Sequence, residues 1–307
     1  MNITVGITSY NQSALLRVAI ESVLSQTRQP AEIIIVDDAS TDDSRHLIDS
    51  YVNKYPDLIR PIFLNHNGGP NNARNQVIDA AGGEFLTFLD GDDRWLATKL
   101  EQETKRLTMA DQPDAVFSNF YFTDGAGNRE FMWVSDSTPR PPEGHILPQV
   151  LALNLPRNTL FRSEIVPTRL WREAGYFDSS FTIYGDWDMR VRLAAAVGRF
   201  GYLDEPLCEY RRHGQGLSNK PIEMHLAAVD HIEQKYAGLI SQLNETTRKS
   251  PIRGLDKFRA KLLRRAALDS LLLPSTPARK QAIRYYQQSL RFDRVLDFRL
   301  FWYLLKA

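Results

Sequence analysis

Residues 84–93 read EFLTFLDGDD, an apolar run that ends in three closely spaced carboxylates. The run from Glu84 to Asp90 has the length and composition of a buried strand. Three acidic side chains within four residues repel one another, so their position at the end of such a strand is costly unless a cation neutralises them. Mg²⁺ is usually held by one or two carboxylates together with substrate phosphates. The stretch therefore predicts either a metal site built for a diphosphate or a solvated acidic turn that caps the next helix.

The segments on both sides of this stretch alternate between strands and helices. Before it, the sequence predicts buried strands over residues 3–8, 32–37 and 59–64, and helices over residues 13–26, 42–55 and 72–81. After it, the series continues with a helix over residues 98–109 and a strand over residues 115–122. Such alternation is typical of an α/β fold with a mostly parallel, Rossmann-like sheet and helices on both faces. Ligands of these sheets bind outside the carboxyl ends of the strands, where the acidic stretch is expected.

The rest of the chain follows a different pattern. The sequence predicts helices over residues 166–175 and 186–197, a strand over residues 202–210, and mostly helix from residue 221, with breaks near 250–254 and at Pro274 and Pro277. The charge divides at nearly the same point. Residues 1–219 hold 21 Lys and Arg against 29 Asp and Glu, a net of −8, and residues 220–307 hold 17 against 8, a net of +9. We expect an α/β domain over residues 1–219 and a basic helical C-terminal region over residues 220–307.

Composition bounds the class of protein and its location. The single cysteine, Cys208, excludes an internal disulfide. The N-terminus lacks the basic start and apolar run of a signal peptide, and no stretch approaches about 20 apolar residues, so a cytoplasmic protein is expected. Residues 255–273 interleave Leu with Lys and Arg. This pattern predicts either a peripheral contact with the inner face of a membrane, or a helical subdomain that packs on the core or on a second subunit.

Polar and aromatic residues follow the other predicted strands. Tyr10 has an aromatic face suited to stacking on a planar base, and Asp37 or Asp38 is able to accept a hydrogen bond from a base N–H. Residues 67–75 (NGGPNNARN) combine a Gly-rich turn, a helix start and Arg74, which suits phosphate. Each motif also has a plain alternative, namely a strand-end tyrosine, a helix cap and a surface loop.

Two later motifs carry further chemistry. Asp186 and Asp188 open a predicted helix in the string GDWD, where they suit either helix capping or, for Asp186, the role of a general base. Arg211, Arg212 and His213 precede a Gly-containing loop. They suit either a flap over phosphates, with His213 as a metal or phosphate ligand, or a solvated basic loop.

The order of these motifs resembles the family 2 glycosyltransferases, which have the GT-A fold. The resemblance covers about residues 1–218 and rests on the strings TSYN, VDDASTD, ARN, FLDGDD, GDWD and YRRHG, which occur in the family's order. It implies a nucleotide-sugar-binding and catalytic domain over residues 1–219. The implied activity is an inverting transfer of a sugar from a nucleotide-diphosphate sugar, expected to be a UDP-sugar, to an acceptor hydroxyl. The implied cofactor is a divalent metal, Mn²⁺ or Mg²⁺, and the implied setting is the synthesis of bacterial cell-surface or exported polysaccharide or glycolipid.

The resemblance also implies roles for individual residues. The implied catalytic base is Asp186. The implied nucleotide contacts are Thr8, Tyr10, Asp38, Asn67, Arg74, Asp90, Gly91, Asp92, Arg211 and Arg212. The implied metal ligands are Asp90, Asp92, Asp93 and His213. The implied acceptor side comprises Asn158, Thr159, Trp187 and Asp188. In the family a Glu often precedes the base, whereas here Gly185 does, so any role of that Glu is absent.

Two other functions fit parts of the pattern. A non-catalytic module that binds a nucleotide sugar would keep the pocket without turnover. A nucleotidyltransferase would usually carry a Gly-rich, basic signature near its N-terminus, which residues 5–15 lack. No GxGxxG or Walker A lysine motif is present, which argues against NAD enzymes and P-loop NTPases. The expected partners are a sugar donor and a carbohydrate or lipid-linked saccharide acceptor, and no nucleic acid.

Overall fold

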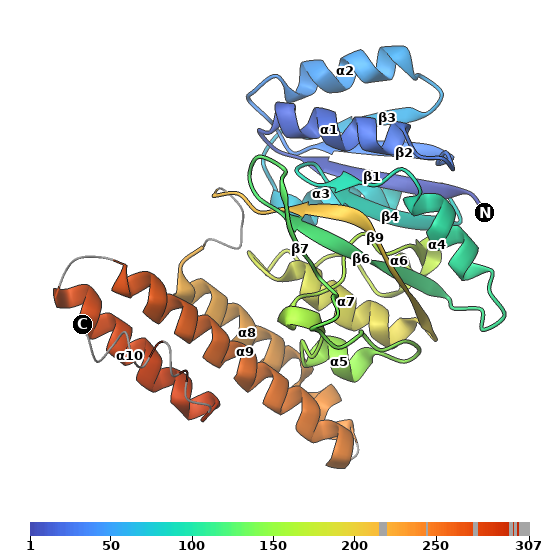
Figure 1. The fold of residues 1–307 in the computed structure, drawn as a ribbon. Helices are drawn as coiled ribbons and strands as arrows, with labels where there is room; N and C mark the ends of the chain where they lie inside the picture. The colour runs from blue at the N-terminus through green and yellow to red at the C-terminus, as the bar shows by residue number, and fades with distance from the viewer. Residues whose placement is uncertain (215–219, 244, 273–275, 295–296, 298–299, 301–307) are drawn as a thin grey trace. The chain divides into compact units, whose positions relative to one another are not determined.

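The structure, a computed structural model, describes residues 1–214, 220–243, 245–272, 276–294, 297 and 300. The chain divides into two compact units. The first comprises Met1–Val150 and Leu155–Gly216, and the second comprises Leu151–Asn154 and Leu217–Ala307. The first unit holds two sheets with flanking helices, and the second holds the long C-terminal helices (Figure 1).

The larger sheet confirms the predicted α/β class. Its strand order is β3-β2-β1-β4-β8. The bounds are β1 Ile3–Ser9, β2 Glu32–Asp37, β3 Ile59–Phe63, β4 Phe85–Asp90 and β8 Val166–Pro167. The first four strands are parallel and β8 is antiparallel to β4. Every residue of β1 (ITVGITS) is buried, which agrees with its β-branched, largely uncharged sequence and with a sheet covered on both faces.

Helices cover the two faces of this sheet (Figure 1). Right-handed crossovers place α1 (Ser13–Leu24) and α2 (Ser44–Lys54) on one face, and α3 (Gly69–Ala80) on the other with α6 (Thr168–Glu173). Helix α3 packs very closely against β1. A Cβ atom at Gly6 would lie 2.4 Å from Cγ1 of Val77, so only glycine permits this approach.

The register of the strands brings the predicted motifs to one edge. Ser9 of β1 is level with Asp37 of β2, and Thr8 is level with Asp90 of β4. Because parallel strands share their carboxyl ends, the loops after β1, β2, β3 and β4 open at the same edge.

A second sheet extends the first unit. Its order is β5-β9-β6-β7, and β6 and β9 are parallel. The bounds are β5 Arg94–Trp95, β6 Ala115–Thr123, β7 Arg129–Met132 and β9 Phe200–Arg211. Helix α4 (Lys99–Leu107) packs on β6 and β9, and α7 (Gly185–Ala196) precedes β9. The remaining short elements are α5 (Leu147–Leu151) and the 3₁₀ turn η1 (Pro156–Asn158).

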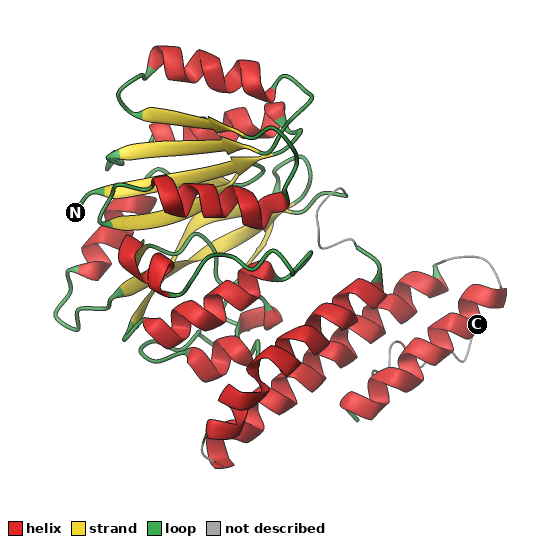
Figure 2. Ribbon diagram, turned by 180° about the vertical axis from the view of Figure 1, so that it is seen from behind, coloured by secondary structure: helices red, strands yellow, loops and turns green. Residues whose placement is uncertain are grey.

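The described residues of the second unit form three long helices, which are drawn in Figure 2. They are α8 (Ile222–Gln242), α9 (Glu245–Leu271) and α10 (Thr276–Phe292). The predicted break near 250–254 is wrong, because Pro251 lies inside α9. Pro277 is the second residue of α10, a position that tolerates proline, and the predicted break at Pro274 lies outside the described residues. Within the described part of the chain, no helix has the length and apolar composition needed to cross a membrane.

Candidate functional site

The acidic turn after β4 lies where the chain passes from one sheet to the other. The backbone N–H of Asp93 donates to the carbonyl oxygen of Asp90 at 3.0 Å, and the N–H of Gly91 donates to that of Thr8, also at 3.0 Å. A Cβ atom at Gly91 would lie 2.8 Å from the Thr8 oxygen. Glycine therefore lets the turn close tightly over the end of β1 before β5 enters the second sheet.

Asp90 is neutralised by arginines. Its Oδ1 lies 2.6 Å from Nη2 of Arg74, and its Oδ2 lies 3.9 Å from Nη1 of Arg162. Burial would raise the pKa of the Asp90 carboxyl, but the two guanidinium groups outweigh burial and lower it. The sequence predicted that a metal cation would neutralise the acidic cluster. For Asp90 this is corrected, because Arg74 and Arg162, which are distant in sequence, neutralise its charge.

Asp93 also has a protein partner. Its carboxyl group is buried, and Oδ1 accepts a hydrogen bond from the backbone N–H of Arg211 at 2.9 Å. Burial, followed by the nearby charge of Asp92, raises the pKa of the Asp93 carboxyl well above its usual value. The structure therefore gives Asp93 the character of a buried acid that anchors β9, which argues against the predicted role of metal ligand.

Asp92 and His213 form a pair suited to a metal ion. Nε2 of His213 lies 2.8 Å from Oδ2 of Asp92, and both side chains are about one-quarter exposed. Among the described residues, no three His, Cys, Asp or Glu side chains gather as a metal site. A carboxylate and an imidazole nevertheless fit an ion that takes its remaining ligands from a diphosphate and water. Of the four predicted ligands, Asp92 and His213 are the two whose side chains lie in contact with each other and are both partly exposed.

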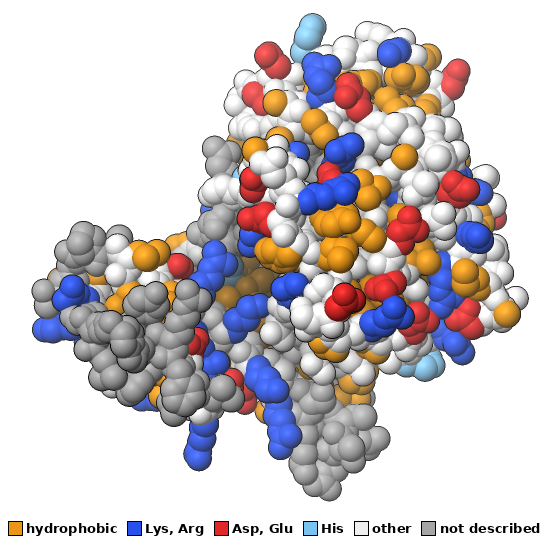
Figure 3. Space-filling view, in the orientation of Figure 1, with side chains coloured by type: hydrophobic (Ala, Val, Ile, Leu, Met, Phe, Trp, Pro, Cys, Tyr) orange, Lys and Arg blue, Asp and Glu red, His pale blue; other side chains and the backbone are white. Residues whose placement is uncertain are grey.

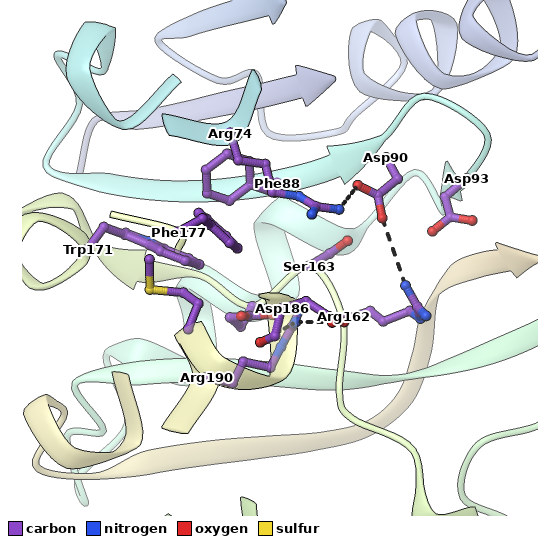
Figure 4. A pocket seen from close by; sticks show the side chains of 12 residues that line it. Arg74, Phe88, Asp90, Asp93, Arg162, Ser163, Trp171, Phe177, Asp186 and Arg190 are labelled. Atoms are coloured by element: carbon purple, nitrogen blue, oxygen red, sulfur yellow. Dashed lines mark hydrogen bonds and ion pairs between the residues drawn. The ribbon is translucent and has the colours of Figure 1, made fainter. Parts of the chain in front are cut away.

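A pocket that is partly open to solvent lies beside Asp90 (Figure 4). One wall is aromatic. Phe88 packs edge-on against Trp171 and Phe177, with ring centroids 5.0 and 6.0 Å apart. The other walls carry charged and polar groups, together with Met189: Arg74, Asp90, Asp93, Arg162, Ser163, Glu164, Asp186 and Arg190. The predicted base thus shares a pocket with the arginines that hold the acidic strand end.

Asp186 lies in the first turn of α7, with about one-third of its side chain exposed. Tyr184, which precedes the helix, has a left-handed backbone with φ of 63°. Nη1 of Arg190, one turn further on, lies 3.4 Å from Oδ2 of Asp186, and its Nη2 lies 2.9 Å from Oε2 of Glu164. Arg190 therefore bridges Asp186 to a carboxylate of another segment.

Arg162 occupies the centre of the polar wall. Its Cζ lies 3.4 Å from the centroid of the Tyr210 ring, a cation–π contact. Burial would lower the pKa of its guanidinium group, but Tyr210, Asp93 and Asp90 raise it above its ordinary value. Nε of Arg162 is buried without a hydrogen-bond partner among the described residues. The pocket thus presents a fixed positive charge, and one N–H group of Arg162 makes no hydrogen bond to the described residues.

The loops after β1, β2 and β3 meet at the same edge. Both carboxylate oxygens of Asp38 accept backbone hydrogen bonds, from Gly68 at 2.8 Å and Gly69 at 2.7 Å. Oδ1 of Asn67 accepts from the N–H of Gly69 at 3.1 Å. Tyr10 leaves 44% of its surface exposed. These contacts order the Gly-rich turn and leave an aromatic ring free at the rim.

The other predicted site residues do not line the pocket. Trp187 and Asp188 are fully buried, so their predicted acceptor contact is wrong. Nε1 of Trp187 donates to the oxygen of Val150, and Asp188 pairs with Arg192 at 2.6 Å. Arg212 pairs with Glu130 and packs over the Phe131 ring, whereas Arg211 donates from Nε to the backbone carbonyl oxygen of Asp92 at 3.1 Å. Asn158 and Thr159 are half-buried and do not line the pocket.

Arg162, Glu164 and Arg190 line the pocket but were not predicted as site residues from the sequence. A signal was present for each of them. Arg162 and Glu164 interrupt the apolar run LFRSEIV, and charges in such a run require partners. Arg190 follows Asp186 by four residues in a predicted helix, the spacing of an ion pair.

Asn71 explains why glycine precedes the predicted base. Its Nδ2 donates to the carbonyl oxygens of Asp178 at 3.1 Å and Phe181 at 2.9 Å, which fixes the loop that leads into α7. A Cβ atom at Gly185 would lie 2.3 Å from Nδ2 of Asn71. The space of a side chain at position 185 is therefore taken by an amide of α3.

We predict that Gly185→Ala destabilises the protein by about 1–3 kcal/mol, the usual cost of overpacking. Asn71→Ala alone should also destabilise, because two carbonyl groups lose their donor. The double variant should be less destabilised than the sum of the two, by at least about 0.5 kcal/mol, as expected for residues in contact. Urea denaturation of the four proteins measures this coupling, and strict additivity would contradict the assigned clash.

The GT-A architecture expected from the sequence is confirmed by comparison with known proteins. The chain is similar to the solved structure of S. aureus TarS 1–349 in complex with UDP-GlcNAc, with a TM-score of 0.61 and 20% sequence identity. The similarity covers 96% of this chain and 92% of that one. An uncharacterised protein of Mycobacterium tuberculosis is 33% identical over 214 residues, which cover 68% of this chain. The present chain spans 58% of that relative's length.

Similarity to named transferases covers shorter segments. The GalNAc(5)-diNAcBac-PP-undecaprenol beta-1,3-glucosyltransferase of Campylobacter jejuni is 40% identical over 100 residues, 32% of each chain. The sequence model described as glycosyl transferase family 2 matches residues 4–169, more than half of the chain. These 166 residues contain the Gly-rich turn, the acidic turn after β4 and Arg162 of the pocket. This match shows that the chain belongs to glycosyl transferase family 2.

Proposed function

We propose that this chain is an inverting glycosyltransferase that moves a sugar from a UDP-sugar to an acceptor hydroxyl. The observation that carries the proposal is the shared pocket of Asp186 and the arginine-bound Asp90 at the carboxyl edge of the sheet. Such an edge is where ligands of parallel sheets bind. Of these two carboxylates, Asp90 is held by a contact of 2.6 Å with Arg74, whereas Asp186 has a longer contact of 3.4 Å with Arg190 and is suited to proton transfer.

The donor nucleotide is proposed to bind across the loops of β1 to β4. Tyr10 would stack on the base, Asp38 and Asn67 would shape the base and ribose site, and Thr8 and Gly91 would contribute the floor. Arg74 and Asp90 would orient the ribose and sugar, and Arg211 would face the diphosphate. The UDP-GlcNAc complex of TarS supports UDP as the nucleotide of this architecture.

Arg162 is also proposed to contact the nucleotide-sugar donor. Its guanidinium group lies between Asp90 and Tyr210, and its Nε has no hydrogen-bond partner among the described residues. A fixed cation in a partly buried pocket stabilises negative charge that develops on a leaving diphosphate.

The chemical step is a single displacement. The oxygen of the acceptor hydroxyl forms a bond to the anomeric carbon while the bond from that carbon to the diphosphate oxygen breaks, so the configuration inverts. Asp186 takes the hydroxyl proton, and the nucleoside diphosphate leaves with the electron pair of the broken bond. Arg190 orients the Asp186 carboxylate through the contact at 3.4 Å. Asn158 and Thr159 remain proposed contacts on the acceptor side.

Asp92 and His213 are the residues proposed to hold a divalent metal, Mn²⁺ or Mg²⁺. Their atoms converge at 2.8 Å and both side chains are accessible. When bound, the ion would neutralise charge on the diphosphate. A mixed oxygen and nitrogen pair suits Mn²⁺ at least as well as Mg²⁺, because Mg²⁺ favours oxygen ligands.

The acceptor is proposed to be a saccharide of a cell-surface polymer or glycolipid. The name of the Campylobacter relative, which specifies an undecaprenol-linked saccharide, supports an acceptor of this class.

We predict that Asp186→Asn lowers the turnover of sugar transfer by about 10²–10⁴-fold, the usual contribution of a general base, with UDP affinity unchanged. A screen of UDP-sugars by thermal shift selects the donor, and release of UDP with an acceptor measures transfer. Glu173→Gln, on an exposed carboxylate of α6, is the matched control. Transfer at the wild-type rate in Asp186→Asn would place the base elsewhere, and a wild-type protein that binds UDP-sugar without transfer would be a binding module.

We predict that Asp92→Asn and His213→Ala each remove most of the Mn²⁺-dependent gain in UDP affinity, by at least about tenfold, since even an indirect partner of a metal contributes that much. Asp93→Asn is the control on the same turn, because its oxygen still accepts from Arg211, and it should keep the gain. Calorimetry with and without Mn²⁺ gives the comparison. An equal loss in all three variants would reject the assignment of the metal to Asp92 and His213.

The second unit is proposed to contact an anionic lipid surface through α10. Figure 3 shows Lys and Arg side chains along the helical unit with few acidic side chains among them. Lys280, Arg284 and Arg291 of α10 are exposed at spacings of four and seven, which lie on one face of a helix, and Arg294, just after the helix, is also exposed. Helix α10 contains no Asp or Glu, and its opposite face is buried at Ala282, Tyr286 and Ser289.

We predict that Lys280→Glu, Arg284→Glu and Arg291→Glu together lower binding to phosphatidylglycerol vesicles by about 3 kcal/mol, on the order of 100-fold, at about 1 kcal/mol per basic residue. Co-sedimentation with the vesicles measures the loss. Reversal of three exposed basic residues of the first unit, Lys105, Arg140 and Arg169, changes the net charge equally and should have little effect. No vesicle binding by the wild type, with a dimer seen by light scattering, would favour contact with a second subunit.

A further inference from the structure

A buried ion pair is joined to the polar wall of the pocket. Lys99 and Glu103, one turn apart on α4, are both fully buried, and Nζ of Lys99 lies 2.5 Å from Oε2 of Glu103. Oε1 of Glu103 accepts a hydrogen bond from Oγ of Ser118 at 2.9 Å. Burial of two charges is expensive, and apolar residues of similar volume often stabilise a fold as well or better. Packing of α4 therefore does not by itself explain the pair.

The ammonium group of Lys99 has a further partner in the backbone. Nζ donates to the carbonyl oxygen of Ser163 at 2.7 Å, and Oγ1 of Thr87 donates to the same oxygen at 3.0 Å. Nε1 of Trp95 donates to Oγ of Ser163 at 3.2 Å, and Nζ of Lys99 lies 4.4 Å from the centroid of the Trp95 ring. Three side chains from β4, β5 and α4 thus converge on one residue.

Ser163 has a backbone that requires such restraint. Its φ of 51° lies in the left-handed region, which disfavours any residue with a Cβ atom. A residue in this region persists where its surroundings over-determine its conformation. The turn at Ser163 separates Arg162, which faces Asp90, from Glu164, which binds the arginine that bridges to Asp186.

We propose that Lys99 is a positioning residue of the transfer reaction. Its buried ammonium group holds the Ser163 carbonyl and so fixes Arg162 and Glu164 on the pocket wall, while Glu103 supplies the counter-charge. Lys99 is fully buried and acts through the backbone of Ser163, without contact to a substrate. The inference rests on the proposed function for its kinetic test.

The test is the paired variant Lys99→Met with Glu103→Leu, which removes both charges and leaves no orphan ion. Its melting temperature should equal or exceed that of the wild type. Turnover of sugar transfer should fall by about 10- to 100-fold, as expected when a catalytic arrangement shifts by about 1 Å, and UDP affinity should stay the same. Wild-type turnover in the folded paired variant would overturn the proposal.

Arg106→Met is the matched control on the same helix. The Arg106 side chain is 8% exposed and pairs with Asp111 and Glu143, and none of these residues lines the pocket. Turnover should be unchanged. An equal fall in both variants would show a general effect of disturbing α4 and would overturn the positioning role.

Thr87→Val keeps the test decisive if the paired variant does not fold. It removes one donor to the Ser163 carbonyl with little change of volume. Turnover should fall by about twofold to tenfold, the range for one hydrogen bond, with UDP affinity unchanged. Unchanged turnover would count against the proposal.

Crystal structures separate this inference from the proposed function. If the wild type transfers no sugar, the proposed function fails, yet the paired variant still tests the positioning. Ser163 should then leave the left-handed region, and Arg162 should move from the Tyr210 ring. An unchanged Ser163 and Arg162 in the paired variant would overturn the proposal whatever the activity.

Discussion

The site depends on the placement of one carboxylate, Asp90, between two arginines. A half-buried charge at the end of a parallel strand is stabilised by a counter-charge, and here Arg74 and Arg162 provide it at 2.6 and 3.9 Å. Arg74 comes from α3, and Arg162 comes from the segment that leads into β8. Because both must reach Asp90, the helix on one face of the sheet and the segment before its edge strand converge there. The space between them, walled by Phe88, is the pocket.

Helix α3 packs on one face of the larger sheet and also positions several parts of the site. Three of its residues on one face bind different parts of the site. Arg74 binds Asp90, Asn71 fixes the loop before α7, and Asn75 exchanges two hydrogen bonds with the backbone of Phe177, at 2.7 and 2.9 Å. The close approach of α3 to the sheet, which Gly6 permits, sets the distance at which these side chains act. The same helix, α3, therefore positions both the acidic end of β4 and the start of α7, which carries the proposed base.

Sequence reasoning predicted the parts of this arrangement that local periodicity determines. The four parallel strands and their common edge follow from continuous apolar runs, so the motifs at Tyr10, Asp38 and Asp90 were expected to meet. The error at Asp90 arose because repulsion was judged from neighbours in sequence, whereas its counter-charges are 16 and 72 residues away. Burial of Trp187 could not be predicted from the sequence either, because it depends on packing in three dimensions. Pro251 inside α9 shows a local rule overridden in the fold.

Arg162 is the clearest case of a residue that sequence alone does not place. Its side chain reaches the pocket because Ser163 turns the backbone in a left-handed conformation, and that conformation is held by donors from β4, β5 and α4. Apolar packing has no direction, so it fills a wall without fixing the orientation of a guanidinium group. Hydrogen bonds to a carbonyl oxygen have a preferred direction, and in a buried site they weaken steeply when bent. The charged groups of the pocket are therefore held in fixed orientations by hydrogen bonds from polar side chains on both sides. Side chains of α3 provide them on one side, and Lys99 provides them on the other.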